Sequence, residues 1–299
     1  MICTHSKFTL VTAKIGDKES ELSTIAILDF VRFIMFDSPS SCFQISHLDW
    51  LVKVYKGTTS RVDRIVLTVL AGYEREAGLS VLDQVLKQWS KDTEDGDLTS
   101  VIDATRMIQT LTEYPVDQDI EDIFNHDAEF VVRSRDYPLY DIAFILPFTT
   151  ALLEKVEQQQ VDLLLLIQSN LVGLAVMALS STSEKTRRAS VPILSRVQDM
   201  ILNSTLKERQ PLWTLLESFK NAIEIDHGQT VPRIPLLLAS FVAQSLTILL
   251  KPESSMYSLI NRFLLQRPVI DLSVSFFSPR LPPGHSHVLR NGIFLFRIQ

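Results

Sequence analysis

The sequence predicts an all-α protein made of antiparallel helix pairs. Three observations support this fold class. Apolar residues recur at helical spacing, hydroxyl residues stand three positions before an acidic residue at several expected helix starts, and short polar turns separate the helical segments.

The first expected helix spans Glu21–Phe36 and carries apolar residues on nearly every face. A helix of this kind needs neighbours on both sides. The segment Asp37–Cys42 is rich in turn residues, so it ends the helix, and Ile45–Tyr55 begins the next one. Lys56–Thr59 then indicates a helix stop followed by a restart.

Four later helix starts resemble capping boxes, in which a hydroxyl accepts a hydrogen bond from a free backbone N–H and an acid reaches back to the amide of the cap residue. Their residues are Ser60 with Asp63, Ser80 with Asp83, Ser100 with Asp103, and Thr205 with Glu208. Two apolar stripes of helical period agree with them: Val101, Ala104, Ile108 and Leu111, and then Leu206, Trp213, Leu216, Phe219 and Ile223.

From Tyr140 onward the expected helices become strongly apolar, and Pro147 is expected to kink one of them. Residues Glu129–Arg135 fit either a short strand or an extended loop. No repeat of fixed period is visible, yet successive helices joined by polar turns are typical of an α-solenoid of HEAT or armadillo type. We therefore predict such a solenoid, with a compact helical bundle as the alternative.

Composition argues against several classes of function. The chain has only 9 glycines in 299 residues and no glycine cluster that would bring backbone N–H groups against a phosphate. Two distant cysteines, Cys3 and Cys42, suggest neither a disulfide framework nor a metal site. The only close histidine pair is His285 and His287, without a third ligand nearby. We predict no enzyme activity, no cofactor, no metal and no small-molecule substrate.

Two apolar segments are candidates for membrane spans, Leu163–Leu179 and Leu236–Leu250. The first is interrupted by polar residues, and the second is shorter than the roughly 20 residues needed to cross a bilayer. Both are therefore interpreted as buried helices, and no membrane contact is expected.

Charge is distributed unevenly along the chain. The total is −6, but from Lys251 onward six Lys or Arg accompany two acidic residues, which makes this end +4 and leaves −10 for residues 1–250. Within the basic end, Met256–Leu272 predicts a short amphipathic helix with apolar Leu259, Ile260, Phe263 and Leu264. Its polar residues are the candidate contacts for RNA or a partner protein, and they are Asn261, Arg262, Gln266 and Arg267.

Arg187-Arg188-Ala189-Ser190 resembles a basophilic kinase site. A phosphate on Ser190 would place about −1.5 to −2 charge beside two arginines and so alter a docking surface. Ser190 is therefore a candidate phosphorylation site.

A set of motifs along the chain carries a family resemblance. The motifs are His47–Arg64, Gly72–Glu74, Ile102–Ile108 with Tyr114-Pro115, Tyr140–Pro147, Ser169–Ser180, Leu249–Pro252 and Met256–Leu272. Together they resemble the C-terminal domain of the nucleolar pre-ribosomal-associated protein 1 family, in a fungal-type form. They occur in the family's order over roughly residues 45–272, and after Leu272 the pattern is lost.

The resemblance implies a fragment of a longer helical scaffold that acts in the nucleolus, in early assembly of the large ribosomal subunit and in pre-rRNA processing. The implied partners are pre-ribosomal assembly factors, including a DEAD-box helicase, together with pre-rRNA or small nucleolar RNA. A general helical-repeat adaptor for proteins only is the alternative. We expect an N-terminal helical segment at 1–44, a helical-repeat domain at 45–272 and a poorly ordered tail at 273–299, which we interpret as a truncated or mis-spliced end.

Overall fold

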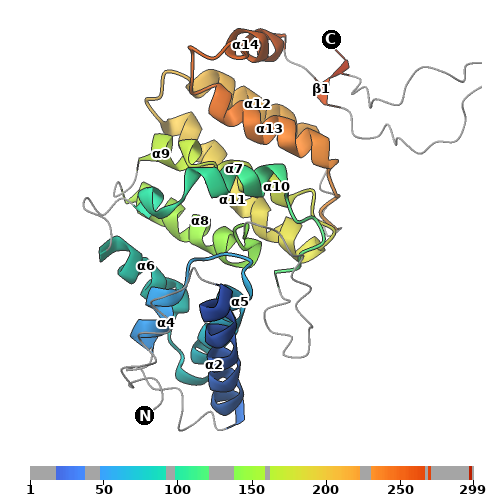
Figure 1. Ribbon diagram of the computed structural model, residues 1–299. Helices are drawn as coiled ribbons and strands as arrows, with labels where there is room; N and C mark the ends of the chain where they lie inside the picture. Colours follow the sequence, from blue (N-terminus) through green and yellow to red (C-terminus); the bar gives the residue numbers. More distant parts are fainter. Residues whose placement is uncertain are drawn as a thin grey trace, which may run out of the picture. The chain divides into compact units, whose positions relative to one another are not determined.

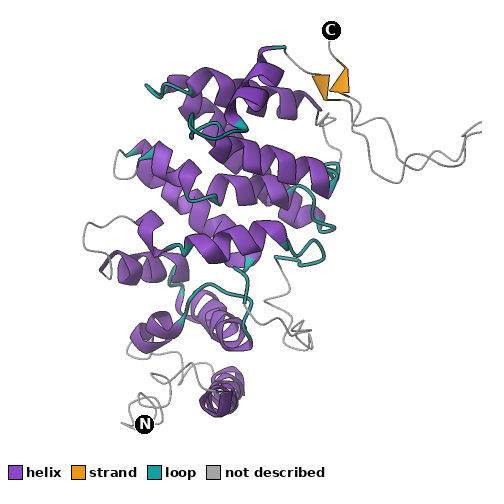
Figure 2. Cartoon of the chain, turned by 45° about the horizontal axis from the view of Figure 1, so that its top comes forward, coloured by secondary structure: helices purple, strands orange, loops and turns teal. Residues whose placement is uncertain are grey.

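The computed structural model describes residues 18–37, 48–91, 98–120, 138–158, 162–222, 230–266, 269–270 and 296–297. In these ranges the regular elements are helices apart from one pair of two-residue strands and an isolated bridge between Thr58 and Tyr140, which confirms the all-α prediction (Figures 1 and 2). The elements are α2 (Lys18–Asp37), α4 (Leu48–Val54), α5 (Arg61–Ala77), α6 (Val81–Lys91), η2 (Leu98–Val101), α7 (Ala104–Thr112), α8 (Ile142–Glu157), α9 (Leu163–Gln168), α10 (Leu171–Ala178), α11 (Glu184–Asn203), α12 (Arg209–Ala222), α13 (Leu236–Ile248), α14 (Tyr257–Leu265), β1 (Val269–Ile270) and β2 (Phe296–Arg297).

The chain divides between Leu171 and Val172 into two compact units, residues 1–171 and 172–299. The division falls inside the range 45–272, and the predicted domain limits stay predictions. Of the predicted tail, only β2 is described, and it pairs antiparallel with β1. The segment Glu129–Arg135 lies outside the described residues. No helix in the described ranges is both long and apolar enough to cross a bilayer.

In unit 1, helix α2 packs along α5 and buries one side of its apolar surface. Leu28, Val31 and Met35 are buried on that side. The opposite side leaves Leu22, Phe30 and Phe33 exposed, with Phe33 at 70%. The sequence predicted neighbours on both sides of this helix, whereas the described residues cover only one.

An aromatic cluster forms part of the core of unit 1. The ring of Phe144 in α8 makes edge contacts with Tyr55 at 4.9 Å and with Trp89 of α6 at 5.4 Å between centroids. Trp89 also contacts Phe148, one helical turn further along α8, at 5.5 Å. Such contacts stabilise a core beyond the area they bury, so this cluster ties α6 to α8 and to the residue after α4.

Gly57 allows the chain to turn directly beside this cluster. Its φ is +70°, a conformation that L side chains rarely adopt, and a Cβ placed there would lie 2.9 Å from the ring of Phe144. Glycine therefore satisfies two requirements at this position, the left-handed backbone and the close approach of an aromatic ring.

We expect Gly57→Ala to lower the free energy of unfolding by about 2–4 kcal/mol, because backbone strain and the collision with Phe144 add together. Gly78→Ala is the matched control, since its φ is +63° but no atom lies within 4 Å of the added methyl. The control should lose about 1 kcal/mol from strain alone. Urea denaturation measures both values, and equal losses would contradict the steric part of the argument.

In unit 2, α12 is the central helix and contacts α11, α13, α14 and β1. Helix α10 is apolar around its whole circumference, and its Gly173 lies against Ala243 of α13, where an added Cβ would meet the Ala243 Cβ at 3.4 Å. The turn after α10 is closed by arginines. Arg187 donates to the carbonyls of Ser181, Thr182 and Val231, and Arg233 donates to that of Ser180.

The predicted capping boxes are only partly correct. Ser60 and Ser80 accept hydrogen bonds from the amides of Asp63 and Asp83, as expected for caps. Ser100 instead lies within η2, and Asp103 itself caps α7 by accepting from the amide of Arg106. The start predicted at Thr205 is also wrong, because α12 begins at Arg209. At α7 the cap is therefore formed by Asp103, the candidate that lies closer to the helix.

Candidate partner-binding surface

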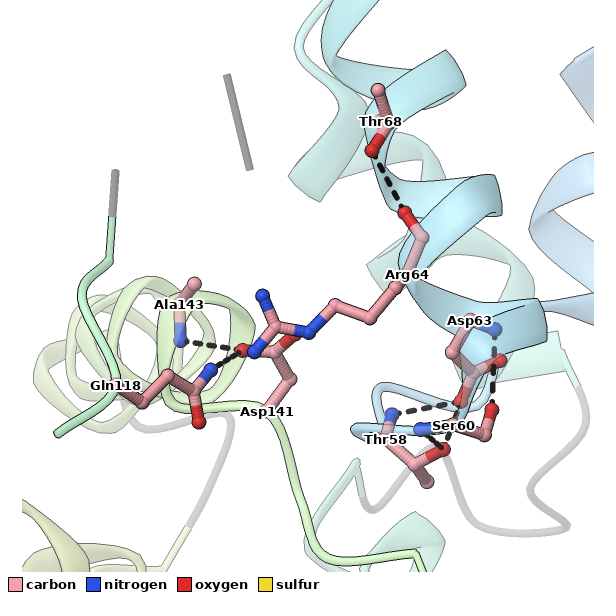
Figure 3. Close-up of polar contacts among 8 residues, drawn as sticks. All are labelled: Thr58, Ser60, Asp63, Arg64, Thr68, Gln118, Asp141 and Ala143. Atoms are coloured by element: carbon pink, nitrogen blue, oxygen red, sulfur yellow. Dashed lines mark hydrogen bonds and ion pairs between the residues drawn. The ribbon is translucent and has the colours of Figure 1, made fainter. Parts of the chain in front are cut away.

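Unit 1 contains a buried group of charged side chains, which is the first candidate for a functional site (Figure 3). Asp63, in the first turn of α5, is only 2% exposed. Its carboxylate accepts hydrogen bonds from the backbone N–H groups of Lys56 and Thr58 and from the Thr58 hydroxyl. The acid therefore does not reach back to Ser60, as a capping box requires, but fixes the turn that precedes the helix.

Arg64 and Asp141 form an ion pair beside this turn. The guanidinium Nε lies 2.7 Å from a carboxylate oxygen of Asp141, whose side chain is fully buried. The other Asp141 oxygen accepts hydrogen bonds from the side-chain amide of Gln118 and from the backbone N–H of Ala143. Through the second bond Asp141 caps α8. Figure 3 shows these donors converging on Asp141 from three segments.

Backbone hydrogen bonds hold the two halves of this arrangement together. The amide of Thr59 donates to the carbonyl of Leu139 at 2.7 Å, and the amide of Asp141 donates to that of Gly57 at 2.9 Å. These bonds place Asp141 within reach of Arg64. We name the set Asp63, Arg64, Gln118 and Asp141 the buried ionic cluster.

The surroundings of the buried ionic cluster shift two titration equilibria. Burial raises the pKa of Asp63, although its three hydrogen-bond donors oppose the shift. Burial, reinforced by the nearby carboxylates of Asp141 and Asp63, raises the pKa of the Tyr55 phenol well above its usual value. Shifted pKa values accompany both active sites and structural ion pairs. Here the polar groups are turned toward backbone amides and toward one another, which is the arrangement of a structural cluster.

We expect Arg64→Met to lower the free energy of unfolding by about 3–5 kcal/mol, because it leaves the Asp141 carboxylate buried without its counter-charge. The double variant Arg64→Met/Asp141→Asn should lose less than the single variant, since no unpaired charge remains. Arg188→Met is the control, as its pair with Glu184 is exposed, and it should cost less than about 1 kcal/mol. Denaturant titration checks the order, and similar losses for Arg64→Met and Arg188→Met would contradict it.

Among the described residues, no group of three or more His, Cys, Asp or Glu side chains is placed to hold a metal ion. The second candidate site is therefore a surface, the C-terminal helix of unit 2.

Three of the four predicted contact residues lie on or just after α14. Arg262 and Gln266 are exposed, Asn261 is half-buried, and Arg267 lies outside the described residues. Arg262 forms no ion pair within the described part of the chain. The helix is attached to unit 2 by Ile260 and Leu264, which are buried, and by an edge contact of Phe263 with Phe241 of α13 at 6.3 Å.

The exposed face of α14 also carries two leucines that helical periodicity did not place there. Leu259 was assigned to the buried face but is 59% exposed, and Leu265 is 75% exposed. Both stand three residues from Arg262, so all three side chains share one face of the helix. We call Leu259, Arg262, Leu265 and Gln266 the α14 face. Helical periodicity predicted the exposed position of Arg262. The signal for the exposed leucines is that α14 has more apolar residues than its buried side can hold once Ile260 and Leu264 are buried.

Ser190, the predicted phosphorylation site, is fully buried in α11. Its hydroxyl donates to the carbonyl of Arg187. The two arginines of the motif are also engaged, Arg187 with three backbone carbonyls and Arg188 with Glu184. In this conformation the hydroxyl is not presented to a kinase, so phosphorylation stays a prediction that requires α11 to open.

We expect Ser190→Asp to lower the free energy of unfolding by more than about 2 kcal/mol, because it buries a charge with no partner. Ser190→Ala removes only a local hydrogen bond and should stay within about 1 kcal/mol of the parent. Thermal unfolding of the two variants provides the comparison. Equal stability of the two would show that residue 190 reaches solvent.

The fold and these two sites define a class of protein, an all-helical protein with a structural ionic cluster inside and an apolar, locally basic surface outside. Comparison with known sequences goes further. The model of the nucleolar pre-ribosomal-associated protein 1 family matches residues 172–275. That match begins at the first residue of unit 2.

Two relatives extend the similarity along the chain. The chain is 25% identical to the mouse protein named Nucleolar pre-ribosomal-associated protein 1 and 26% identical to the human protein of the same name. Each alignment covers 91% of this chain but 13% of the relative, so the chain spans about an eighth of their length. No solved structure matches. These findings confirm the predicted resemblance, and the predicted nucleolar location agrees with the relatives' names.

Proposed function

We propose that this chain is part of a non-catalytic helical scaffold that acts in the nucleolus, in early assembly of the large ribosomal subunit and in the processing of pre-rRNA. The observation that carries the proposal is the match along 91% of the chain to two proteins whose name states an association with pre-ribosomes. The match to the family model over residues 172–275 agrees with it.

The arrangement of unit 2 is compatible with a scaffold of solenoid type. Consecutive helices contact each other, α11 with α12 and α12 with α13. Helix α14 also packs against α12. Stacked helices of this kind present extended surfaces on which several partners bind side by side. We therefore propose a HEAT- or armadillo-like solenoid for the longer protein.

The proposed partners are pre-ribosomal assembly factors, among them a DEAD-box helicase, together with pre-rRNA or small nucleolar RNA. The second candidate function is a helical adaptor that contacts proteins alone. The exposed leucines on both sides of Arg262 favour it, since apolar side chains at the centre of a surface are typical of protein partners, whereas RNA phosphates require several cations.

We expect a tagged form of the chain to concentrate in nucleoli and to sediment with large-subunit precursors in sucrose gradients. An unrelated tagged helical protein of similar size is the control and should remain near the top of the gradient. A tagged chain absent from both nucleoli and precursor fractions would overturn the proposal.

Ultraviolet crosslinking separates the two candidates. Recovery of pre-rRNA crosslinked to the chain, weakened by added salt, supports a scaffold with RNA contact. Association with assembly factors that persists after complete nuclease digestion, without crosslinked RNA, supports the protein adaptor.

A further inference from the structure

The α14 face carries one positive charge, Arg262, between two exposed leucines. Residues two positions apart on a helix lie on nearly opposite sides, so Arg262 is directed away from buried Ile260 and Leu264. Leu259 and Leu265 lie on either side of it. Neither α13 nor α14 contains an acidic residue, and Arg262 is the only charged residue in the two helices.

The apolar surface continues from α14 onto α13. The rings of Phe263 and Phe241 are half-buried and meet edge to face between the two helices. Leu237, one helical turn before Phe241, is 60% exposed. A partner that covered the α14 face would therefore find further apolar contacts beside Phe263.

A second copy of this chain is a poor occupant for this surface. In a two-fold dimer the same patch faces itself, which would bring two Arg262 side chains together at the centre of the contact. Like charges placed opposite each other inside an interface oppose association. RNA is also poorly matched, because a single described cation would meet phosphate while Leu259 and Leu265 remained uncovered.

We propose that the α14 face binds an amphipathic helix of another protein, whose apolar residues cover Leu259 and Leu265 and whose carboxylate pairs with Arg262. The charge and the two leucines then form one recognition unit, in which the apolar contacts remove water from around the ion pair and so strengthen it. The inference rests on the proposed scaffold role and specifies the chemistry of one partner.

The test uses the full 299-residue chain with three fluorescent probes. The first is an alanine-based helical peptide of about 20 residues with a stripe of leucines bordered by glutamates, long enough to form a helix in water. The second has lysines in place of the glutamates, and the third is a single-stranded RNA of about 20 nucleotides. Fluorescence anisotropy at two salt concentrations gives each affinity. We expect the glutamate peptide to bind at least about tenfold more tightly than the lysine peptide.

Arg262→Glu should reverse this preference, weakening the glutamate peptide about tenfold and improving the lysine peptide. Leu265→Ser should weaken the glutamate peptide about fivefold through lost apolar contact. Lys207→Glu makes the same charge change at an exposed position of unit 2 outside α13 and α14 and should alter affinity by less than about twofold. Since all three positions are exposed, circular dichroism should show unchanged helix content.

Three results would overturn the proposal. Equal binding of both peptides means unspecific apolar contact, and RNA binding that is lost in Arg262→Glu without peptide discrimination means a nucleic-acid site. A dimer in analytical ultracentrifugation that Leu265→Ser dissociates means a second copy of the chain.

The failures of the two proposals are distinguishable. One outcome is that the chain does not sediment with large-subunit precursors while the glutamate peptide still binds the parent more tightly than Arg262→Glu. In that case the scaffold role is wrong and the α14 face remains a protein-binding site. If the chain sediments with precursors and no peptide discrimination occurs, only the inference about the α14 face falls.

Discussion

The ion pair of Arg64 with Asp141 is the contact on which unit 1 depends. Asp141 is the N-cap of α8, and Arg64 lies in the first turn of α5, so a single pair sets the positions of two helix starts that are far apart in the chain. Removing two charges from water costs several kcal/mol for each ion, and good geometry with further hydrogen bonds is needed to compensate. Gln118 and Ala143 supply those bonds to the Asp141 carboxylate. Together with these bonds, the pair fixes the start of α5 against the start of α8.

Much of the fold was predictable because local signals and burial coincide. The helix at Glu21–Phe36, the buried helices within Leu163–Leu179 and the restart after Ser60 follow from period and capping. The predictions failed where two neighbouring residues could both cap the same helix, since Asp103 and not Ser100 caps α7. The role of Asp63 was also beyond local reasoning, because its hydrogen bonds reach back to Lys56 and Thr58 and do not follow the capping pattern.

The candidate surface shows the same limit in a different form. Periodicity identifies Arg262 as a polar residue of an amphipathic helix, but it assigns Leu259 to the core along with Ile260. A helix of nine residues has few buried positions, and in α14 Ile260 and Leu264 occupy them. Which leucine is left outside depends on the tilt of α14 on α12, a tertiary property that a single sequence does not encode locally. Ser190 is a further case, since its motif is local while its burial is set by the packing of α11.

Two arginines, Arg187 and Arg233, link the end of α10 to the segment that leads into α13. Arg187 holds the carbonyl of Val231, Arg233 holds that of Ser180, and the amide of Ile234 donates to the carbonyl of Leu179. The entry to α13 is thus anchored to the end of α10. A substitution at Arg187 or Arg233 would therefore disturb two places in unit 2 at once, the end of α10 and the start of α13.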